Sequence, residues 1–192
     1  MHCNDRTYFP GGFAVLDEES LVRRAQKHDE EAFSQLYEAN FNKVYRYLVL
    51  RIGAGEEAED ITQQVFINAL QSISSYQWKG APFTAWLYRI AHNQMVDYLR
   101  RRDRRITVPI DDLDLKADDD PVRTTENVMD MEMFQRASQN LTESQREVIS
   151  LRFSSDLPIA EVARIMGKSP GAVKALQHSA VASLRKAMGD AI

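Results

Sequence analysis

The segment from Leu141 to Lys186 constrains the fold of this chain most strongly, because it encodes three consecutive helices with start and stop signals. Thr142 followed by Gln145 has the pattern of a capping box at the start of the first helix. Gly167 suits the left-handed residue that ends the second helix, and Ser169 suits the N-cap of the third. Two helices joined by a short glycine-containing turn form a helix-turn-helix, whose second helix can lie in a DNA major groove.

The third helix of this segment has one apolar face and one polar face. Val173 and Ala180 recur at helical spacing and predict the buried side. Lys174, Gln177 and His178 fall together on the solvated side, where they can donate hydrogen bonds to bases or phosphates. An ordinary helical hairpin would also have an amphipathic last helix. The agreement of caps, turn glycine and exposed donors favours DNA binding over that alternative.

Composition and length limit the other possibilities. A chain of 192 residues with 44% hydrophobic and 27% charged residues is typical of a globular protein with one sizeable domain or two small ones. Cys3 is the only cysteine, which excludes an internal disulfide framework and a multi-cysteine zinc site. His2 beside it does not complete a metal site, so we expect no metal and no cofactor. No apolar run reaches the ~18 residues that span a bilayer, and the N-terminus lacks a secretion signal. We therefore expect no membrane insertion and a cytoplasmic location.

The net charge of -4 is unevenly distributed along the chain. Residues 1–105 carry 14 basic and 14 acidic side chains, residues 106–134 carry 2 and 9, and residues 135–192 carry 8 and 5. The acidity is thus concentrated in one segment, which is also rich in Asp and contains Pro121. Such a composition is typical of a solvated linker.

The N-terminal part of the chain is predicted to be all helix. We expect helices from Asp17 to Ala25, after Asp29, through Val44 toward Gly53, from Glu56 to Ile73 and from about Phe83 to Arg102. The predicted fold is all-α, with two small helical domains joined by a flexible acidic linker. The expected boundaries are a flexible extension at 1–15, a helical domain at 16–105, the linker at 106–134 and a helix-turn-helix domain at 135–192.

The segment from Tyr76 to Arg105 has the residue types that bind unstacked bases. Aromatic side chains alternate with amides and guanidinium groups, and five of the six residues from 100 to 105 are arginines. Aromatic stacking contributes ~1–3 kcal/mol per base in single-strand binding. A basic run also interacts favourably with the dipole at a helix C-terminus, but five arginines exceed what one helix end requires. The segment therefore favours nucleic-acid binding.

The order of these segments resembles bacterial sigma factors of the extracytoplasmic-function (ECF) group in the sigma-70 family. The resemblance rests on EEAFSQLYEANFNKVYRYL, EDITQQVFINAL and FTAWLYRIAHNQMVDYLRRRDRR, followed by the acidic linker and the helix-turn-helix. It implies a region 2 domain and a region 4 domain without the intervening region 3. It also implies a promoter-specificity subunit that binds core RNA polymerase, recognises the -35 and -10 elements and assists strand opening. The polymerase performs nucleotide transfer, so the chain itself is not expected to be an enzyme.

The resemblance assigns site residues by matching positions. Contacts with the clamp helices of the polymerase β′ subunit are implied for Asp60, Gln63, Gln64 and Ile67. Contacts with the -10 element are implied for Trp78, Lys79, Phe83, Trp86, Arg89, His92, Asn93, Arg100, Arg101 and Arg102. Contacts with the -35 element are implied for Ser169, Pro170, Gly171, Lys174, Ala175, Gln177, His178 and Ser179. The helix at 143–153 is similar to the one that contacts the polymerase β flap, and an anti-sigma factor is a further expected partner.

Two alternatives belong to other classes of protein. A two-domain helix-turn-helix regulator would dimerise and bind duplex DNA without polymerase, but the aromatic and basic segment at 83–105 argues against it. An enzyme would need a nucleophile with its base, a phosphate-binding glycine loop or metal-ligand spacing, and the sequence has none of these patterns. Members of the family often have several Arg or Ser residues along this helix, whereas this chain has Ala175, Leu176 and Ser179 at such positions. Base recognition is therefore expected to depend on Lys174, Gln177 and His178.

Overall fold

A computed structural model describes residues 18–78, 81–106, 140–154 and 157–189. All regular secondary structure in these ranges is helical, which confirms the predicted fold class. The expected N-terminal extension at 1–15 and residues 107–134 of the expected linker lie outside the described residues. The elements are α1 (Glu18–Ala25), α2 (Glu30–Ile52), α3 (Glu56–Ser72), the 3-10 turn η1 (Ile73–Ser75), α4 (Phe83–Ile106), α6 (Glu143–Ser154), α7 (Ile159–Met166) and α8 (Pro170–Gly189).

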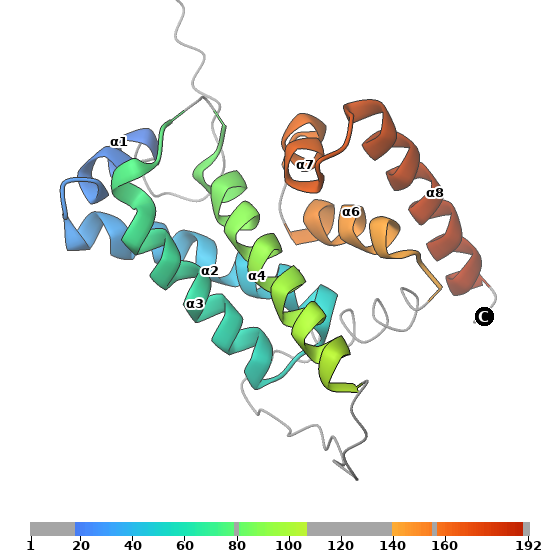
Figure 1. Ribbon diagram of the computed structural model, residues 1–192. Coiled ribbons are helices and arrows are strands. Elements are labelled where there is room, and N and C mark those ends of the chain that lie inside the picture. Colours follow the sequence, from blue (N-terminus) through green and yellow to red (C-terminus); the bar gives the residue numbers. More distant parts are fainter. Residues whose placement is uncertain (1–17, 79–80, 107–139, 155–156, 190–192) are drawn as a thin grey trace, which may run out of the picture.

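The first four helices pack around a shared apolar core (Figure 1). Leu36 and Val44 of α2, Val65 of α3, and Leu87 and Met95 of α4 are all almost fully buried there. The buried side chains of α3 and α4 recur at helical spacing, so one face of each helix supplies this core.

Helix α2 corrects one prediction, because the two helices expected between Asp29 and Gly53 form one continuous helix of 23 residues. Asp29 caps it as predicted, since its side chain accepts a hydrogen bond from the backbone N–H of Ala32 at 3.1 Å. No Pro or Gly interrupts the sequence from residue 30 to 52. Asn40, in the middle of this helix, is buried, and its Nδ2 donates to the carbonyl of Leu36 at 2.8 Å. The hydrogen-bonding groups of this amide are therefore satisfied inside the helix, with Thr84 Oγ1 donating to its Oδ1.

The N-terminus of α4 is held in place by α1. The backbone N–H of Phe83 donates to Oε2 of Glu18 at 3.0 Å, so a carboxylate of α1 caps α4. Gln26 Nε2 donates to the carbonyls of Ile73 and Tyr76, which holds η1 and the following loop against α1. The loop before α4 is thus attached to a rigid part of the fold.

Helices α6, α7 and α8 form the predicted helix-turn-helix unit. The capping box is present, with Thr142 N–H donating to Gln145 Oε1 at 2.9 Å and Gln145 N–H donating to Thr142 Oγ1 at 3.3 Å. Gly167 has φ 61° and ψ 34°, the left-handed conformation expected of it. Ser169 accepts a hydrogen bond from Ala172 N–H at the start of α8. Pro158 precedes α7 as its N-cap and is not its first helical residue.

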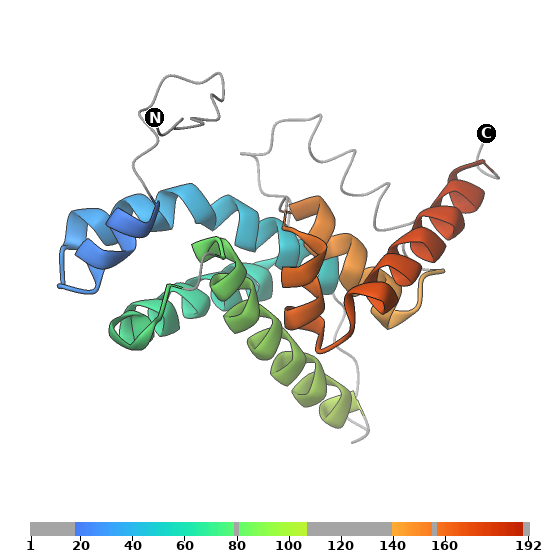
Figure 2. The same ribbon diagram turned by 90° about the horizontal axis from the view of Figure 1, so that it is seen from above.

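The two groups of helices are in contact. α6 packs against α2, and α7 packs against α4, so the buried core continues from one group into the other (Figure 2). Among the described helices, none combines the length and the apolar character that crossing a bilayer requires.

Candidate nucleic-acid interface

Three aromatic rings cluster where the loop before α4 meets that helix. The ring centroids of Tyr76 and Trp86 are 4.7 Å apart, those of Phe83 and Trp86 are 5.3 Å apart, and those of Tyr76 and Phe83 are 5.7 Å apart. Phe83 is completely buried, so it supports the cluster from the core. Trp78 and Trp86 are half-buried and pack against the core with part of their surface in solvent. Lys79, predicted to belong to the same site, lies outside the described residues.

The solvent face of α4 carries the predicted polar and basic side chains. Arg89, Asn93 and the three arginines 100–102 are exposed. Arg100 is 3.7 Å from Asp97, and the guanidinium of Arg102 lies 5.9 Å from the ring centroid of Tyr98. These contacts are on the surface, where such interactions are weak, so the cationic groups remain available to a phosphate backbone.

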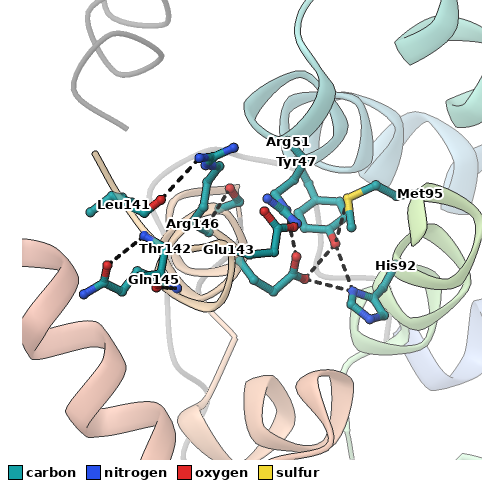
Figure 3. Close-up of polar contacts among 11 residues, drawn as sticks. Tyr47, Arg51, His92, Met95, Leu141, Thr142, Glu143, Gln145 and Arg146 are labelled. Atoms are coloured by element: carbon teal, nitrogen blue, oxygen red, sulfur yellow. Dashed lines mark hydrogen bonds and ion pairs between the residues drawn. The ribbon is translucent and has the colours of Figure 1, made fainter. Parts of the chain in front are cut away.

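His92 differs from the other predicted residues of α4, because it faces α6. Its Nδ1 lies 3.0 Å from Oε1 of Glu147 and 3.5 Å from the hydroxyl of Tyr47 (Figure 3). The structure therefore does not group His92 with the exposed side chains of α4 that are predicted to bind bases.

Glu147 is the centre of a buried polar network between α6 and helices α2 and α4. Tyr47 Oη donates to its Oε1 at 2.8 Å, and Arg51 Nε donates to its Oε2 at 2.7 Å. Arg51 also forms an ion pair with Glu143, one turn earlier on α6. Glu147 and Arg51 are 4% and 7% exposed, so both charges are almost completely withdrawn from water.

The electrostatics of this network follow from burial and pairing. Burial by itself would raise the pKa of Glu147, but the His92 hydrogen bond and the Arg51 charge outweigh it and hold that pKa below the ordinary value. Burial opposes the charge of Arg51 as well, yet the nearby carboxylates raise its pKa. Burial and the adjacent Glu147 raise the pKa of the Tyr47 hydroxyl. The network is therefore a charged carboxylate–guanidinium pair with a neutral tyrosine donor.

Sequence reasoning did not identify this network. Tyr47 and Glu147 are 100 residues apart, and no local pattern connects them. One signal was present in α6, where Glu147, Ser150, Leu151 and Ser154 share a helical face and are all buried. A carboxylate on the same face as a core leucine indicates a buried partner elsewhere in the fold.

The predicted -35 residues gather at the N-terminal half of α8. Seven of the eight are exposed there: Ser169, Pro170, Gly171, Lys174, Ala175, His178 and Ser179. Gln177 is half-buried. A groove beside them is lined by Ile159 from α7 and by Lys174, Gln177, His178, Val181, Ala182 and Arg185 from α8. Arg185 adds a cationic group to this groove that the sequence interpretation did not include.

A side chain of α6 holds α8 in place. Gln145 Nε2 donates to Ser179 Oγ at 2.8 Å, while the Oε1 of the same amide caps α6. Ser179 is therefore engaged by a protein side chain and is not free for DNA alone.

The residues predicted to contact polymerase lie along one exposed face of α3. Asp60, Gln63 and Gln64 are exposed, and Ile67 is 47% exposed. Leu70, one turn further on, is 54% exposed and extends the apolar part of this face. Large apolar side chains at this exposure are typical of a protein-contact surface when they occur together.

Comparisons with known proteins agree with this division of the helices. The family model described as "Sigma-70 region 2" matches residues 36–105, and that described as "Sigma-70, region 4" matches residues 139–186. The ECF RNA polymerase sigma factor ShbA of Streptomyces griseus subsp. griseus is 31% identical over 176 residues, covering 86% of this chain and 92% of ShbA. The chain belongs to the ECF RNA polymerase sigma factors. This confirms the resemblance drawn from the sequence motifs.

Other relatives of this sigma factor are similar over most of its length. The ECF RNA polymerase sigma factor BldN of Streptomyces coelicolor is 34% identical over 176 residues; the match covers 88% of this chain and 65% of BldN. Among solved structures, CnrH in complex with the cytosolic domain of CnrY has a TM-score of 0.67 and 25% identity, covering 91% of this chain and 97% of that chain. As an ECF sigma factor, the chain is a promoter-specificity subunit of RNA polymerase.

Proposed function

We propose that this sigma factor reads the -10 element with the loop before α4 and with α4 itself, reads the -35 element with α8, and assists strand opening. The observation that carries the proposal is the aromatic cluster of Tyr76, Phe83 and Trp86 beside the exposed basic face of α4. The protein acts as a specificity subunit without chemistry of its own. We assign region 2 to residues 16–105 and region 4 to residues 135–192.

The -10 proposal follows from the chemistry of an unstacked base. Holding a base outside the duplex costs a few kcal/mol, and stacking on an aromatic ring returns ~1–3 kcal/mol per base. Trp78 and Trp86 present the ring surfaces, and Arg89 and Asn93 supply adjacent donors. The arginines at 100–102 neutralise phosphates along the same strand.

The -35 proposal follows from the position of α8 in the helix-turn-helix unit. The second helix of such a unit lies in the major groove, with its N-terminal residues at the base edges. Lys174, Gln177 and His178 line one groove of the protein and contact bases or phosphates. Arg185, two turns after His178, binds the phosphate backbone at the end of that groove.

Polymerase binding is assigned to α3 and α6. Asp60, Gln63, Gln64 and Ile67 contact the clamp helices of β′, and Leu70 enlarges the apolar contact. α6 contacts the β flap. Two small domains on one large enzyme gain affinity through effective concentration, so each DNA-reading face needs only modest affinity of its own.

We also propose that an anti-sigma factor restrains this protein in the cytoplasm. CnrH, a protein of similar fold, was solved in complex with the cytosolic domain of CnrY, which supports a second chain as a regulator of this fold.

Runoff transcription tests the proposal with purified core RNA polymerase from Streptomyces coelicolor and a library of promoter fragments. We expect a set of transcripts that requires the added sigma factor. Lys174→Ala should lower the selectivity for the -35 sequence, whereas Lys186→Ala, an exposed lysine further along the same helix, should not. Arg89→Ala should reduce permanganate-detected strand opening, with Arg46→Ala on α2 as its control. Transcripts that are the same with and without the sigma factor would refute the assignment.

A further inference from the structure

The side chain of Gln145 makes two hydrogen bonds whose donors and acceptors are fixed by chemistry. Its Oε1 accepts from the backbone N–H of Thr142 at 2.9 Å, as the capping box of α6 requires (Figure 3). A backbone N–H can only donate, so this bond identifies the oxygen end of the amide. The other end is the NH2 group, which donates to Ser179 Oγ of α8 at 2.8 Å. Ser179 Oγ is therefore the acceptor in that bond.

The Ser179 hydroxyl keeps its own proton for another partner. A hydroxyl has one donor and two acceptor lone pairs, and Gln145 occupies only a lone pair. Elsewhere in the described helices, hydroxyls donate to the carbonyl four residues earlier, as Thr62 does to Ala58 and Ser150 does to Arg146. Within the part of the chain that the structure describes, the Ser179 proton has no such acceptor. Because Ser179 is exposed, this proton is available to a ligand in solvent.

Ser179 lies on a different flank of α8 from the cationic side chains. Lys174, His178 and Arg185 line the groove beside Ile159, and Ser179 is not part of that lining. At ~100° per residue, Ser179 is ~140° from Lys174 and ~120° from Arg185 around the helix axis. The exposed surface of α8 thus has two flanks, one with cationic side chains and one with the Ser179 hydroxyl.

A helix in the major groove has a phosphate backbone beside each flank. The groove is ~12 Å wide, which leaves little space between the helix and either strand. Base edges are contacted by the N-terminal residues of such a helix. Ser179 is ~13 Å along the axis from Pro170, the first residue of α8, so its flank faces a backbone. This step rests on the proposed function, because it uses the assignment of α8 to the -35 element.

We propose that Gln145 is a positioning residue for DNA binding, which holds Ser179 Oγ as an acceptor and thereby directs the Ser179 proton to a phosphate oxygen of the -35 element. Gln145 itself touches no DNA. Its bond prevents the hydroxyl from turning back to the helix carbonyl, which is the usual competing partner of a serine in a helix. A donor fixed before binding loses less entropy when the phosphate arrives. The capping box of α6 thus also prepares a DNA contact on α8.

Promoter duplexes with single neutral phosphates test the contact directly. Holoenzyme is assembled from core RNA polymerase and the full chain, and its affinity is measured by fluorescence anisotropy. Each phosphate of the -35 element is replaced in turn by a methylphosphonate. One of the replacements that weaken binding of the unsubstituted chain should have little effect on Ser179→Ala. Ser179→Ala itself should bind the unmodified duplex about tenfold more weakly, as expected for loss of a hydrogen bond to a charged group.

Gln145→Glu reverses the bond to Ser179 while it keeps the cap of α6. A carboxylate oxygen still accepts from Thr142 N–H, but a carboxylate has no proton to donate, so the Ser179 proton turns toward it. We expect the same methylphosphonate to lose its effect and the affinity to fall about tenfold. Gln145→Met removes the donor without adding a charge and should produce part of this loss. In the Ser179→Ala background, Gln145→Glu should lower the affinity little further, because both changes remove the same contact.

Thr142→Ala is the control for the cap alone. Thr142 Oγ1 accepts from Gln145 N–H, so this variant loses half of the capping box and keeps the Gln145–Ser179 bond. It should therefore retain the methylphosphonate pattern of the unsubstituted chain. Binding of every variant to core polymerase is measured alongside, so that a loss of holoenzyme is not counted as a loss of DNA contact.

The salt dependence of binding distinguishes this contact from a cationic one. Lys174→Ala should reduce the slope of log affinity against log salt by about one, because it removes a cation that displaces counterions. Ser179→Ala and Gln145→Met remove no charge and should leave the slope unchanged.

The positioning role is overturned if Ser179→Ala and the unsubstituted chain respond alike to every methylphosphonate. It is also overturned if the losses of Gln145→Glu and Ser179→Ala add fully, since repulsion by the new carboxylate would then explain the first. Failure of the proposed function has a different signature. In that case, scrambling the -35 sequence would leave the affinity of the unsubstituted holoenzyme unchanged.

Discussion

The buried hydrogen bond between Thr84 and Asn40 joins the start of α4 to the middle of α2. Thr84 Oγ1 donates to Asn40 Oδ1 at 2.7 Å, and the two residues are 6% and 2% exposed. This bond lies next to Phe83 and so fixes the end of α4 that carries the aromatic cluster. Removing one partner should lower the free energy of unfolding markedly, because the other partner stays buried without a hydrogen bond from protein or water.

The structure allows the cost to be estimated. Thr84→Val keeps the shape of the side chain but leaves Asn40 Oδ1 without its donor, a loss of ~1–3 kcal/mol in the free energy of unfolding. Asn40→Leu leaves the Thr84 hydroxyl without its acceptor, at a similar cost. The double variant removes both polar groups, so its loss should be smaller than the sum of the single losses by at least ~1 kcal/mol. At ~2–4 °C per kcal/mol for a chain of this size, a 2 kcal/mol loss lowers Tm by ~4–8 °C.

Thermal and urea unfolding of the unsubstituted chain, the two single variants and the double variant measures these losses in the free energy of unfolding. Thr62→Val is the matched control, because Thr62 is also buried but its hydroxyl donates only to the Ala58 carbonyl of its own helix. Removing the Thr62 hydroxyl leaves no side-chain acceptor unpaired, so we expect a much smaller loss in the free energy of unfolding. The reasoning is refuted if Thr84→Val costs no more than Thr62→Val, or if the losses of Thr84→Val and Asn40→Leu simply add.

Three further predictions concern α6, α7 and α3. The pKa of Glu147 is held below its ordinary value in the folded protein. The ionised Glu147 therefore stabilises the fold at pH values above the ordinary carboxyl pKa, and this stabilisation is lost as the pH falls through the lowered pKa. Urea unfolding should therefore show a stability difference between the unsubstituted chain and Glu147→Gln that is largest near neutral pH and shrinks in acid; a constant difference would contradict this. Gly167→Ala should lower stability by ~1 kcal/mol in thermal unfolding, because φ is 61° while the space around a Cβ is open; an unchanged or raised Tm would contradict the strain argument. Asp60→Ala should weaken binding to core polymerase several-fold in a titration without lowering Tm, whereas Glu38→Ala should change neither; equal losses for both variants would remove Asp60 from the interface.

Much of the local structure was predictable because its causes are local. The Thr142–Gln145 capping box, the left-handed Gly167 and the Ser169 cap each depend on residues within a few positions of one another. The apolar stripes of α3 and α4 also follow from spacing alone. The prediction failed in α2, where the two helices expected between Asp29 and Gly53 are one continuous helix and the buried Asn40 bonds to Leu36 and Thr84.

The candidate site was predictable in part for the same reason. Exposed cationic and amide side chains on α4 and α8 could be assigned from their helical faces, and the structure places most of them in solvent. His92 shows the limit of this approach. Its helical position does not reveal that Glu147, 55 residues later, occupies the space beside it.

The sequence by itself determined the family and, outside α2, the helices and their order, because caps, periodicity and motif order are properties of neighbouring residues. Only the tertiary structure decided that α6 docks on α2 and α4, and that Arg51 and Glu147 form a buried pair across 96 residues. A buried charge is tolerated only where the whole fold supplies its partner, and that partner has no fixed distance along the chain.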